Sequence, residues 1–227
     1  LFDYKIYALC SDGDLMEGVS AEAASLAAHL ALGNMIYLYD DNHISIEGST
    51  DIAFSEDVSK RFEAYGWHVQ VVDDGNDLNA LQIAIRNAKA ETRKPSLIRV
   101  RTQIAYGSPN KVNTAGSHGS PLGEDEVKLV KTAFGFDPEV SFYVPEEVAS
   151  FYTAIGEKGG KLEEKWNTLF RSYKEHFPEM AEAYEAILAD QQPKDWEEKL
   201  PVFSGADKIA TRQASGKVLN AIASDLP

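Results

Sequence analysis

The chain has 227 residues, of which 44% are apolar and 26% charged, a balance typical of globular domains. With 22 Lys and Arg against 36 Asp and Glu, its net charge of −14 argues against nucleic acid as a partner, because binding to phosphates needs a cationic face. No apolar run approaches the roughly 20 residues that span a bilayer, so no membrane partner is expected either. A single cysteine, Cys10, excludes an internal disulfide and favours a cytoplasmic protein. Because the chain opens without Met and inside a predicted strand, we expect it to be a piece of a longer polypeptide.

Strands and helices are predicted to alternate along the first half of the chain. The apolar run at residues 4–10 predicts a strand buried on both faces, and an Ala- and Leu-rich helix follows at residues 17–32. Residues 35–39 form the next predicted strand. The alternation continues with helices at residues 58–65 and 77–90 and strands at residues 68–73 and 96–102. These elements predict an α/β fold with a doubly wound, mostly parallel sheet.

The composition changes beyond the last predicted strand. A loop rich in Gly, Pro, Asn and Ser is expected at residues 107–121. Apolar residues then recur at helical spacing, which predicts packing helices. They are Leu162, Trp166, Leu169, Phe170, Tyr173, Phe177, Met180, Tyr184, Ile187 and Leu188. We therefore expect an α/β domain at residues 1–135, a helical linker at 136–201, and the start of another domain, with a helix at 207–223, in residues 202–227.

Two polar clusters follow consecutive predicted strands. Asp12 and Gly13 come after the first strand, and Asn42 follows the second. Carboxyl ends of neighbouring parallel strands share one sheet edge, where open α/β sheets bind ligands. Carboxylate and amide oxygens suit Mg²⁺ or Ca²⁺, and a glycine lets the backbone approach a phosphate. The pattern predicts a diphosphate bridged by a metal ion; alternatively, Asp12 caps a helix and Asn42 only makes a turn.

Several longer stretches carry a resemblance to a known family. SDGDLMEGVSAEAASLAAHLALGN, YDDNHISIEG and HGSPLG resemble transketolase, and Asp12-Gly13 followed about thirty residues later by Asn42 is similar to the thiamine diphosphate signature. The resemblance runs from the first residue to about residue 201, and ATRQASGKVLNAI resembles the entry to the family's pyrimidine-binding domain. One departure is Ser11, where the family motif usually has glycine.

The resemblance implies a role for each matching residue. Asp12 and Asn42 resemble the side-chain ligands of the divalent cation, and Ile44 the residue whose carbonyl completes them. Gly13 and Asn42 resemble residues that touch the cofactor's diphosphate. The resemblance further implies that His118 contacts cofactor and sugar near the reacting carbon, and that the apolar side chain of Ile104 packs against the thiazolium ring. Glu17 and Glu22 resemble acidic residues near the subunit interface that help link the two active sites.

A simpler explanation exists for several of these side chains. In a loop rich in Gly and Ser, a lone His118 is more often solvated. Glu17 and Glu22 are also typical of acids in the first turn of a helix, and Ile104 of core packing. We interpret four histidines and the cysteine as structural: His29, His43, His68, His176 and Cys10. Positive potential for an anionic ligand is expected from three cations, Arg99, Arg101 and Lys111.

The implied activity is transfer of a two-carbon ketol unit from a ketose phosphate to an aldose phosphate by a homodimer, with thiamine diphosphate and Mg²⁺ or Ca²⁺. The family glutamate that activates the aminopyrimidine, the histidines upstream of the metal motif and the arginine that grips the substrate phosphate have no counterpart in this chain. We therefore expect the chain to be inactive alone. Alternatives are related thiamine enzymes (dihydroxyacetone synthase, deoxyxylulose phosphate synthase or phosphoketolase) and a non-catalytic scaffold that binds cofactor or forms dimers.

Overall fold

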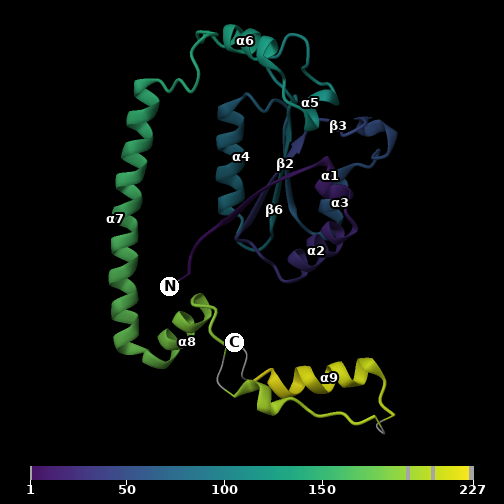
Figure 1. The fold of residues 1–227 in the computed structure, drawn as a ribbon, viewed down its shortest axis with the longest axis vertical. Coiled ribbons are helices and arrows are strands. Elements are labelled where there is room, and N and C mark those ends of the chain that lie inside the picture. Colours follow the sequence, from purple (N-terminus) through teal and green to yellow (C-terminus); the bar gives the residue numbers. More distant parts are fainter. Residues whose placement is uncertain (1, 193–194, 206–207, 225–227) are drawn as a thin grey trace. The chain divides into compact units, whose positions relative to one another are not determined.

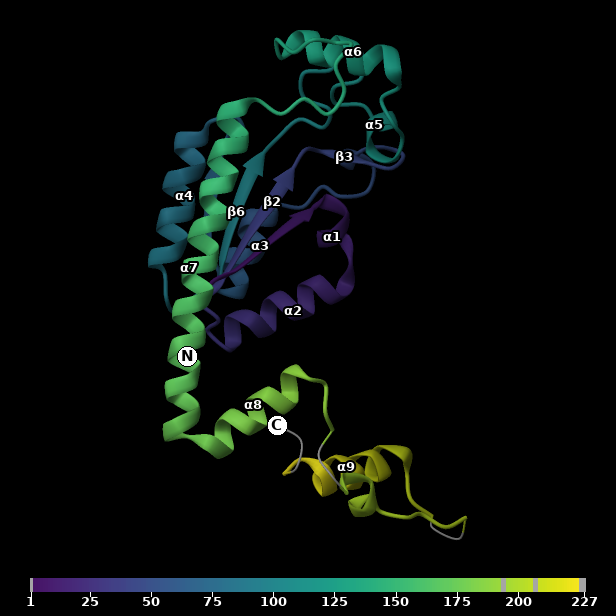
Figure 2. The same cartoon turned by 60° about the vertical axis from the view of Figure 1, so that its left-hand side comes forward.

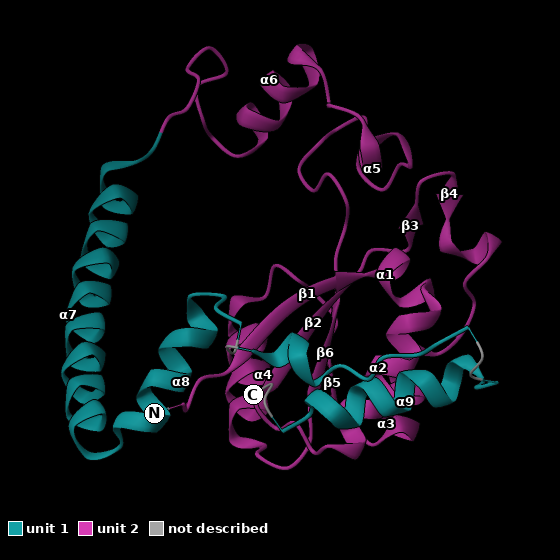
Figure 3. Cartoon of the chain, turned by 60° about the horizontal axis from the view of Figure 1, so that its bottom comes forward, with its two compact units in different colours: residues 1, 144–227 teal, residues 2–143 magenta. Residues whose placement is uncertain are grey.

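The computed structural model describes residues 2–192, 195–205 and 208–224. The chain divides into two compact units, residues 2–143 and residues 144–227, which Figure 3 shows in different colours. The first unit contains the sheet and all the sequence-predicted site residues. The second is helical.

A four-stranded parallel sheet forms the centre of the first unit. Its strands are β1 (Ile6–Ser11), β2 (Met35–Asp41), β5 (His68–Val72) and β6 (Ser96–Arg101). They lie in the order β1-β2-β6-β5, and every pair is parallel. In this register Tyr39 pairs with Cys10 on one side and with Arg99 on the other. The predicted α/β fold with a parallel sheet is confirmed.

Helices cover both faces of the sheet, as Figure 1 shows. On one face lie α2 (Gly18–His29) and α3 (Val58–Tyr65), and on the other lies α4 (Leu78–Ala90). Alternation along β2 explains this, because side chains of successive residues point to opposite faces. One face buries Cys10, Leu15, Ala24, Ala27, Tyr39, Val58, Phe62, Trp67 and Leu97. The opposite face buries Ile36, Val72, Ala84, Ala88, Ile98 and Val100.

The remaining elements of this unit gather beyond the carboxyl ends of the strands, as Figure 2 shows for β3, α5 and α6. They are α1 (Asp12–Met16), β3 (Ile44–Ser45), β4 (Gly48–Ser49), the 3₁₀ helix η1 (Thr50–Ile52), α5 (Gly116–Gly119) and α6 (Glu124–Ala133). The expected loop at residues 107–121 therefore contains one short helix, α5, within its Gly- and Ser-rich part.

Strand β1 corrects one expectation. Its side chains were predicted to be buried on both faces, but Ile6, Tyr7 and Leu9 are 42, 50 and 81% exposed. Among the described residues β1 is an edge strand that pairs only with β2. The helix on the Leu9 face, α4, packs against β2, β5 and β6 instead. A continuous apolar run therefore indicated a strand correctly but not how many neighbours would cover it.

The second unit contains α7 (Glu146–His176), α8 (Pro178–Leu188), the 3₁₀ helix η2 (Trp196–Lys199) and α9 (Thr211–Ile222). Within α7, Trp166 stacks on Phe170 with ring centroids 5.2 Å apart, and Tyr184 of α8 joins the two helices by meeting Phe170 at 5.5 Å. The expected start of the last helix at residue 207 lies outside the described residues. None of the described helices has both the length and the apolarity that a membrane crossing requires.

Candidate functional site

Asp12 stands at the carboxyl end of β1, as the first residue of α1. The N-cap of this helix is Ser11, whose backbone N–H donates to Asp14 Oδ2 at 2.8 Å and whose hydroxyl donates to the same oxygen at 3.0 Å. The carboxylate of Asp14 therefore satisfies the backbone N–H of the N-cap residue, as in a capping box. The alternative that Asp12 merely caps this helix is wrong.

The carboxylate of Asp12 is buried, with only 2% of the residue exposed. Its Oδ1 accepts a hydrogen bond from the Tyr39 hydroxyl, and its Oδ2 is buried without a hydrogen-bond partner among the described residues. Burial raises the pKa of Asp12 above its ordinary value, although the bond from Tyr39 opposes this shift. A buried carboxylate oxygen without a donor is costly, and a cation in contact with it would remove that cost.

Asn42 and Ile44 lie in the turn after β2. Asn42 Oδ1 accepts a hydrogen bond from the Ile44 backbone N–H at 2.9 Å, and Asn42 Nδ2 donates to Asp40 at 3.3 Å. The turn-forming alternative for Asn42 is therefore seen in the structure. It does not exclude metal binding, since an amide oxygen has two lone pairs and this bond uses one. The turn also holds Ile44 beside Asn42, while α1 packs against β3, which contains Ile44.

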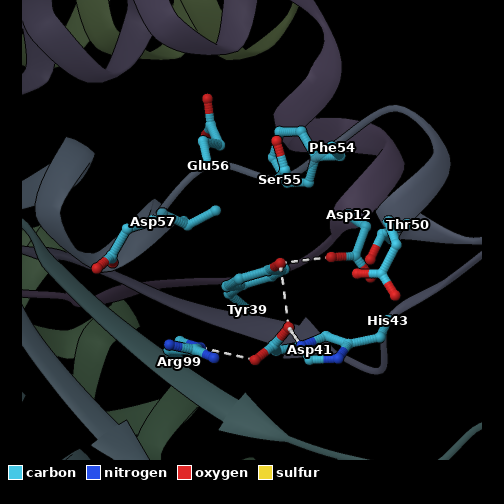
Figure 4. Close-up of a pocket in the computed structure, with 12 residues that line it drawn as sticks. Asp12, Tyr39, Asp41, His43, Thr50, Phe54, Ser55, Glu56, Asp57 and Arg99 are labelled. Carbon is cyan, nitrogen blue, oxygen red and sulfur yellow. Dashed lines mark hydrogen bonds and ion pairs between the residues drawn. The ribbon is translucent and has the colours of Figure 1, made fainter.

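Asp41 connects several polar side chains next to Asp12, as the close-up in Figure 4 shows. Its Oδ1 accepts from the Tyr39 hydroxyl at 3.3 Å and lies 3.1 Å from His43 Nε2. Its Oδ2 accepts from Arg99 Nε at 2.6 Å. These residues line a cavity of about 300 Å³ together with Asp12. Tyr39 and Asp41 were not predicted as site residues, although their i, i+2 spacing already placed both on one face of the strand.

Carboxylates dominate the charge around this site. Arg99, expected to supply positive potential, is paired with Asp41, so its charge is offset. Arg101 donates to the Asp41 carbonyl at 2.6 Å and Lys111 to the Leu122 carbonyl at 2.8 Å. A diphosphate near Asp12 therefore needs a bridging cation to reduce repulsion. Among the described residues no group of three His, Cys, Asp or Glu side chains could hold a metal ion, so a metal ion bound here would need oxygen ligands of other kinds.

Gly13 lies in the first turn of α1, and a Cβ built on it would meet no atom within 4 Å. The space beside it is open, as close approach of a phosphate requires. The helix that begins there has only five residues, because the long helix α2 starts separately at Gly18. The predicted single helix at residues 17–32 is thus preceded by a separate short turn of helix.

His118 and Ile104 come from the segment that follows β6. His118 is an exposed residue of α5, and its N–H donates to the Ala115 carbonyl at 2.9 Å. Ile104 is half-buried in a turn, and its carbonyl accepts from the Asn113 N–H at 3.0 Å. Neither lines the cavity beside Asp12. Both lie in the segment that Figures 1 and 2 show beyond the carboxyl ends of the strands.

Glu17 and Glu22 are exposed. Glu17 precedes α2, and its carbonyl accepts from the Ser20 hydroxyl at 2.7 Å. Glu22 is the fifth residue of α2, so the first-turn explanation does not hold for it. Their side chains do not meet the cavity beside Asp12.

The remaining histidines and the cysteine occupy varied surroundings. His68 Nδ1 lies 3.0 Å from the Ser96 hydroxyl, and His176 Nδ1 lies 2.8 Å from the Ser172 carbonyl. His29 is exposed near the end of α2. Cys10 is buried, and this burial, with nearby carboxylates, raises the pKa of its thiol to about 12. A thiol with that pKa is a poor nucleophile at neutral pH.

Comparisons with known proteins agree with one another. The family described as "Transketolase, thiamine diphosphate binding domain" matches residues 1–193. Transketolase of Bacillus subtilis is 49% identical over 226 residues, which cover 99% of this chain and 34% of that protein. Transketolase of Nostoc is 50% identical over 229 residues, with 100% of this chain and 34% of that protein covered.

Solved structures give the same result. A transketolase from Pichia stipitis, in complex with sedoheptulose-7-phosphate, has a TM-score of 0.87 and 45% identity, covering 99% of this chain and 33% of that one. Transketolase from Leishmania mexicana has a TM-score of 0.88 and 39% identity, with the same two coverages, 99% and 33%. The chain thus spans about a third of the length of the relatives it matches. By sequence and by structure, the chain belongs to the transketolase family and matches its thiamine diphosphate-binding domain.

Proposed function

We propose that this chain supplies the metal and diphosphate site of a transketolase that transfers a two-carbon ketol unit from a ketose phosphate to an aldose phosphate. One observation carries the metal site: the buried Oδ2 of Asp12 has no hydrogen-bond partner among the described residues. Thiamine diphosphate follows from the family, and sugar phosphate substrates are supported by the relative solved with sedoheptulose-7-phosphate. When bound, this cofactor supplies a carbon nucleophile and an electron sink for cleavage beside a carbonyl group.

The proposed cation, Mg²⁺ or Ca²⁺, takes Asp12 Oδ2, the second lone pair of Asn42 Oδ1 and the backbone carbonyl of Ile44. These are hard oxygen ligands, and Mg²⁺ commonly completes its shell with phosphate oxygens and water. The open space at Gly13 and the amide of Asn42 are proposed to face the diphosphate. The cation is needed because Asp12, Asp40 and Asp41 would otherwise repel that group.

His118 is proposed to contact cofactor and sugar, and Ile104 to present its apolar side chain to the thiazolium ring. Histidine is the side chain that most often transfers protons in catalysis, so His118 suits proton exchange with a sugar hydroxyl. Exposure of His118 in this structure is compatible with contact to a bound ligand.

Further proposals concern the whole protein. It is a homodimer in which Glu17 and Glu22 lie near the subunit interface, and it works in the cytoplasm. The proposed domains are residues 1–135, which bind metal and diphosphate, the linker 136–201, and the beginning of the pyrimidine-binding domain at 202–227. The 227-residue chain alone is expected to be inactive, and turnover of a ketose phosphate by it would contradict this.

Calorimetric titration of thiamine diphosphate into the intact protein tests the proposed site, first with Mg²⁺ and then with EDTA. We expect metal-dependent binding that is lost in Asp12→Ala and Asn42→Ala. Asp51→Ala is the matched control, because this exposed aspartate lines the same cavity without a proposed role. Equal binding in EDTA, or wild-type affinity in Asp12→Ala, would refute the assignment.

A further inference from the structure

A buried carboxylate far along the chain from the metal site organises the segment that carries His118. Glu126, in the first turn of α6, is 7% exposed. Its Oε1 accepts hydrogen bonds from the Ser108 hydroxyl and from the Asn110 N–H, the latter at 2.9 Å. Its Oε2 accepts from Asn110 Nδ2 at 2.9 Å. The three bonds hold the pKa of Glu126 below its ordinary value.

These contacts continue toward His118. Ser108 is 3% exposed, and its hydroxyl also accepts a hydrogen bond from the Lys111 N–H at 3.1 Å. The Lys111 carbonyl in turn accepts from the Ser117 hydroxyl at 2.7 Å, and Ser117 is the neighbour of His118. A continuous series of hydrogen bonds therefore runs from Glu126 through residues 108 and 111 to residue 117.

Further contacts attach both ends of this segment. Lys111 Nζ donates to the Leu122 carbonyl at 2.8 Å, just before α6 begins. Gly107 has a φ of +85°, and a Cβ there would lie 2.5 Å from the Phe134 ring at the end of α6. The segment thus passes against the Phe134 side chain, and the positive φ at its entry favours glycine there. In sequence, Glu126 lies between Leu122 and Phe134, the two residues that make these contacts. Its carboxylate accepts hydrogen bonds from the donors of Ser108 and Asn110.

We propose that Glu126 is a positioning residue that holds the segment 108–118, and with it His118, in place for the reaction. Its carboxylate touches neither the proposed metal ligands nor the cavity beside Asp12. The proposal rests on the proposed function only for the role of His118, because ordering of the segment is measurable without turnover. An ordered segment matters for catalysis since small displacements of a contacting group cost rate steeply.

Hydrogen exchange by mass spectrometry on the intact protein measures the order of residues 105–119. In Glu126→Ala, which removes both acceptor oxygens and with them all three hydrogen bonds, we expect peptides from this segment to exchange at least tenfold faster. The matched control is Glu124→Gln, because Glu124 belongs to the same first turn of α6 but is exposed. It should exchange at the wild-type rate.

Swapping the donor and the acceptor of the hydrogen bond between Asn110 and Glu126 distinguishes positioning from general loss of structure. Asn110→Asp alone sets two carboxylates opposite each other and should also loosen the segment. Adding Glu126→Gln restores a donor opposite an acceptor, so the double variant should regain wild-type exchange. If Glu126→Ala leaves exchange unchanged, or the double variant exchanges like Asn110→Asp, the proposal is overturned.

Kinetics on the intact protein give the second readout. Glu126→Ala should lower kcat at least tenfold while leaving the Kd of thiamine diphosphate within twofold of wild type, whereas general unfolding would weaken both. His118→Ala distinguishes the two proposals. If His118→Ala keeps full kcat, the role of His118 under the proposed function fails, and exchange alone then decides on Glu126. A loss in His118→Ala with wild-type kcat in Glu126→Ala overturns the positioning role.

Discussion

Tyr39→Phe deletes one oxygen atom next to the proposed cation ligand and leaves a ring that is 2% exposed in place. The deleted hydroxyl donates to Asp12 Oδ1 and also lies 3.3 Å from Asp41 Oδ1. Since a hydroxyl has one proton, only one strong bond is lost. Without it both oxygens of the Asp12 carboxylate lack a donor, because Oδ2 already has none among the described residues.

The size of the effect follows from these contacts. A hydrogen bond to a charged group contributes about 1.5–3 kcal/mol, so the free energy of unfolding of the metal-free protein should fall by about that amount. Loss of a group that orients a metal ligand typically costs 10–100-fold in metal affinity, or about 1.4–2.7 kcal/mol. We therefore expect Tyr39→Phe to weaken Mg²⁺-dependent binding of thiamine diphosphate by that factor.

The assay is urea denaturation of the metal-free protein, followed by Mg²⁺ titration at saturating thiamine diphosphate. Tyr37→Phe is the matched control, because Tyr37 is on the same face of β2 and packs edge to face on Trp67 with ring centroids 5.5 Å apart. Its hydroxyl has no hydrogen bond to the described residues, so its removal should change neither quantity by more than about 0.5 kcal/mol. Equal behaviour of the two variants would refute the reasoning that Tyr39 holds Asp12.

The remaining predictions each concern a single residue. Because the pKa of Asp12 is raised in the folded state, ionisation of this carboxyl destabilises the folded wild-type protein as pH rises. Asp12→Asn, which cannot ionise, should therefore gain stability relative to wild type between pH 4 and pH 8 in urea denaturation. A difference in stability that stays constant with pH would contradict this. Gly33→Ala should lower the free energy of unfolding by about 1–3 kcal/mol, since its Cβ would lie 2.1 Å from the Thr92 carbonyl oxygen. Gly13→Ala has open space for its Cβ, so it should fold normally but bind thiamine diphosphate more weakly by calorimetry. Cys10 should resist a thiol reagent at pH 8 until the chain is unfolded, because burial raises its pKa to about 12; prompt labelling of folded protein would disprove it.

Local patterns in the sequence determined much of the architecture. Short apolar runs bounded by turn residues marked all four strands of the main sheet, and the intervening helices followed from apolar residues at helical spacing. Parallel strands separated by helices must end at a common edge, so Asp12 and Asn42 were predicted to share one side of the sheet. The family motifs assigned roles that spacing alone left open.

Neighbours distant in sequence decided the rest. The exposure of Leu9 depends on β1 being an edge strand that α4 does not cover, which no property of residues 4–10 reveals. The pairing of Asp41 with Arg99 requires β6 to lie beside β2, although 58 residues separate the two side chains. Burial of Glu126 likewise depends on the segment that begins at Gly107 folding back against α6. In each case a polar or apolar side chain acquires its surroundings from tertiary packing, because periodicity specifies the face of an element but not what covers that face.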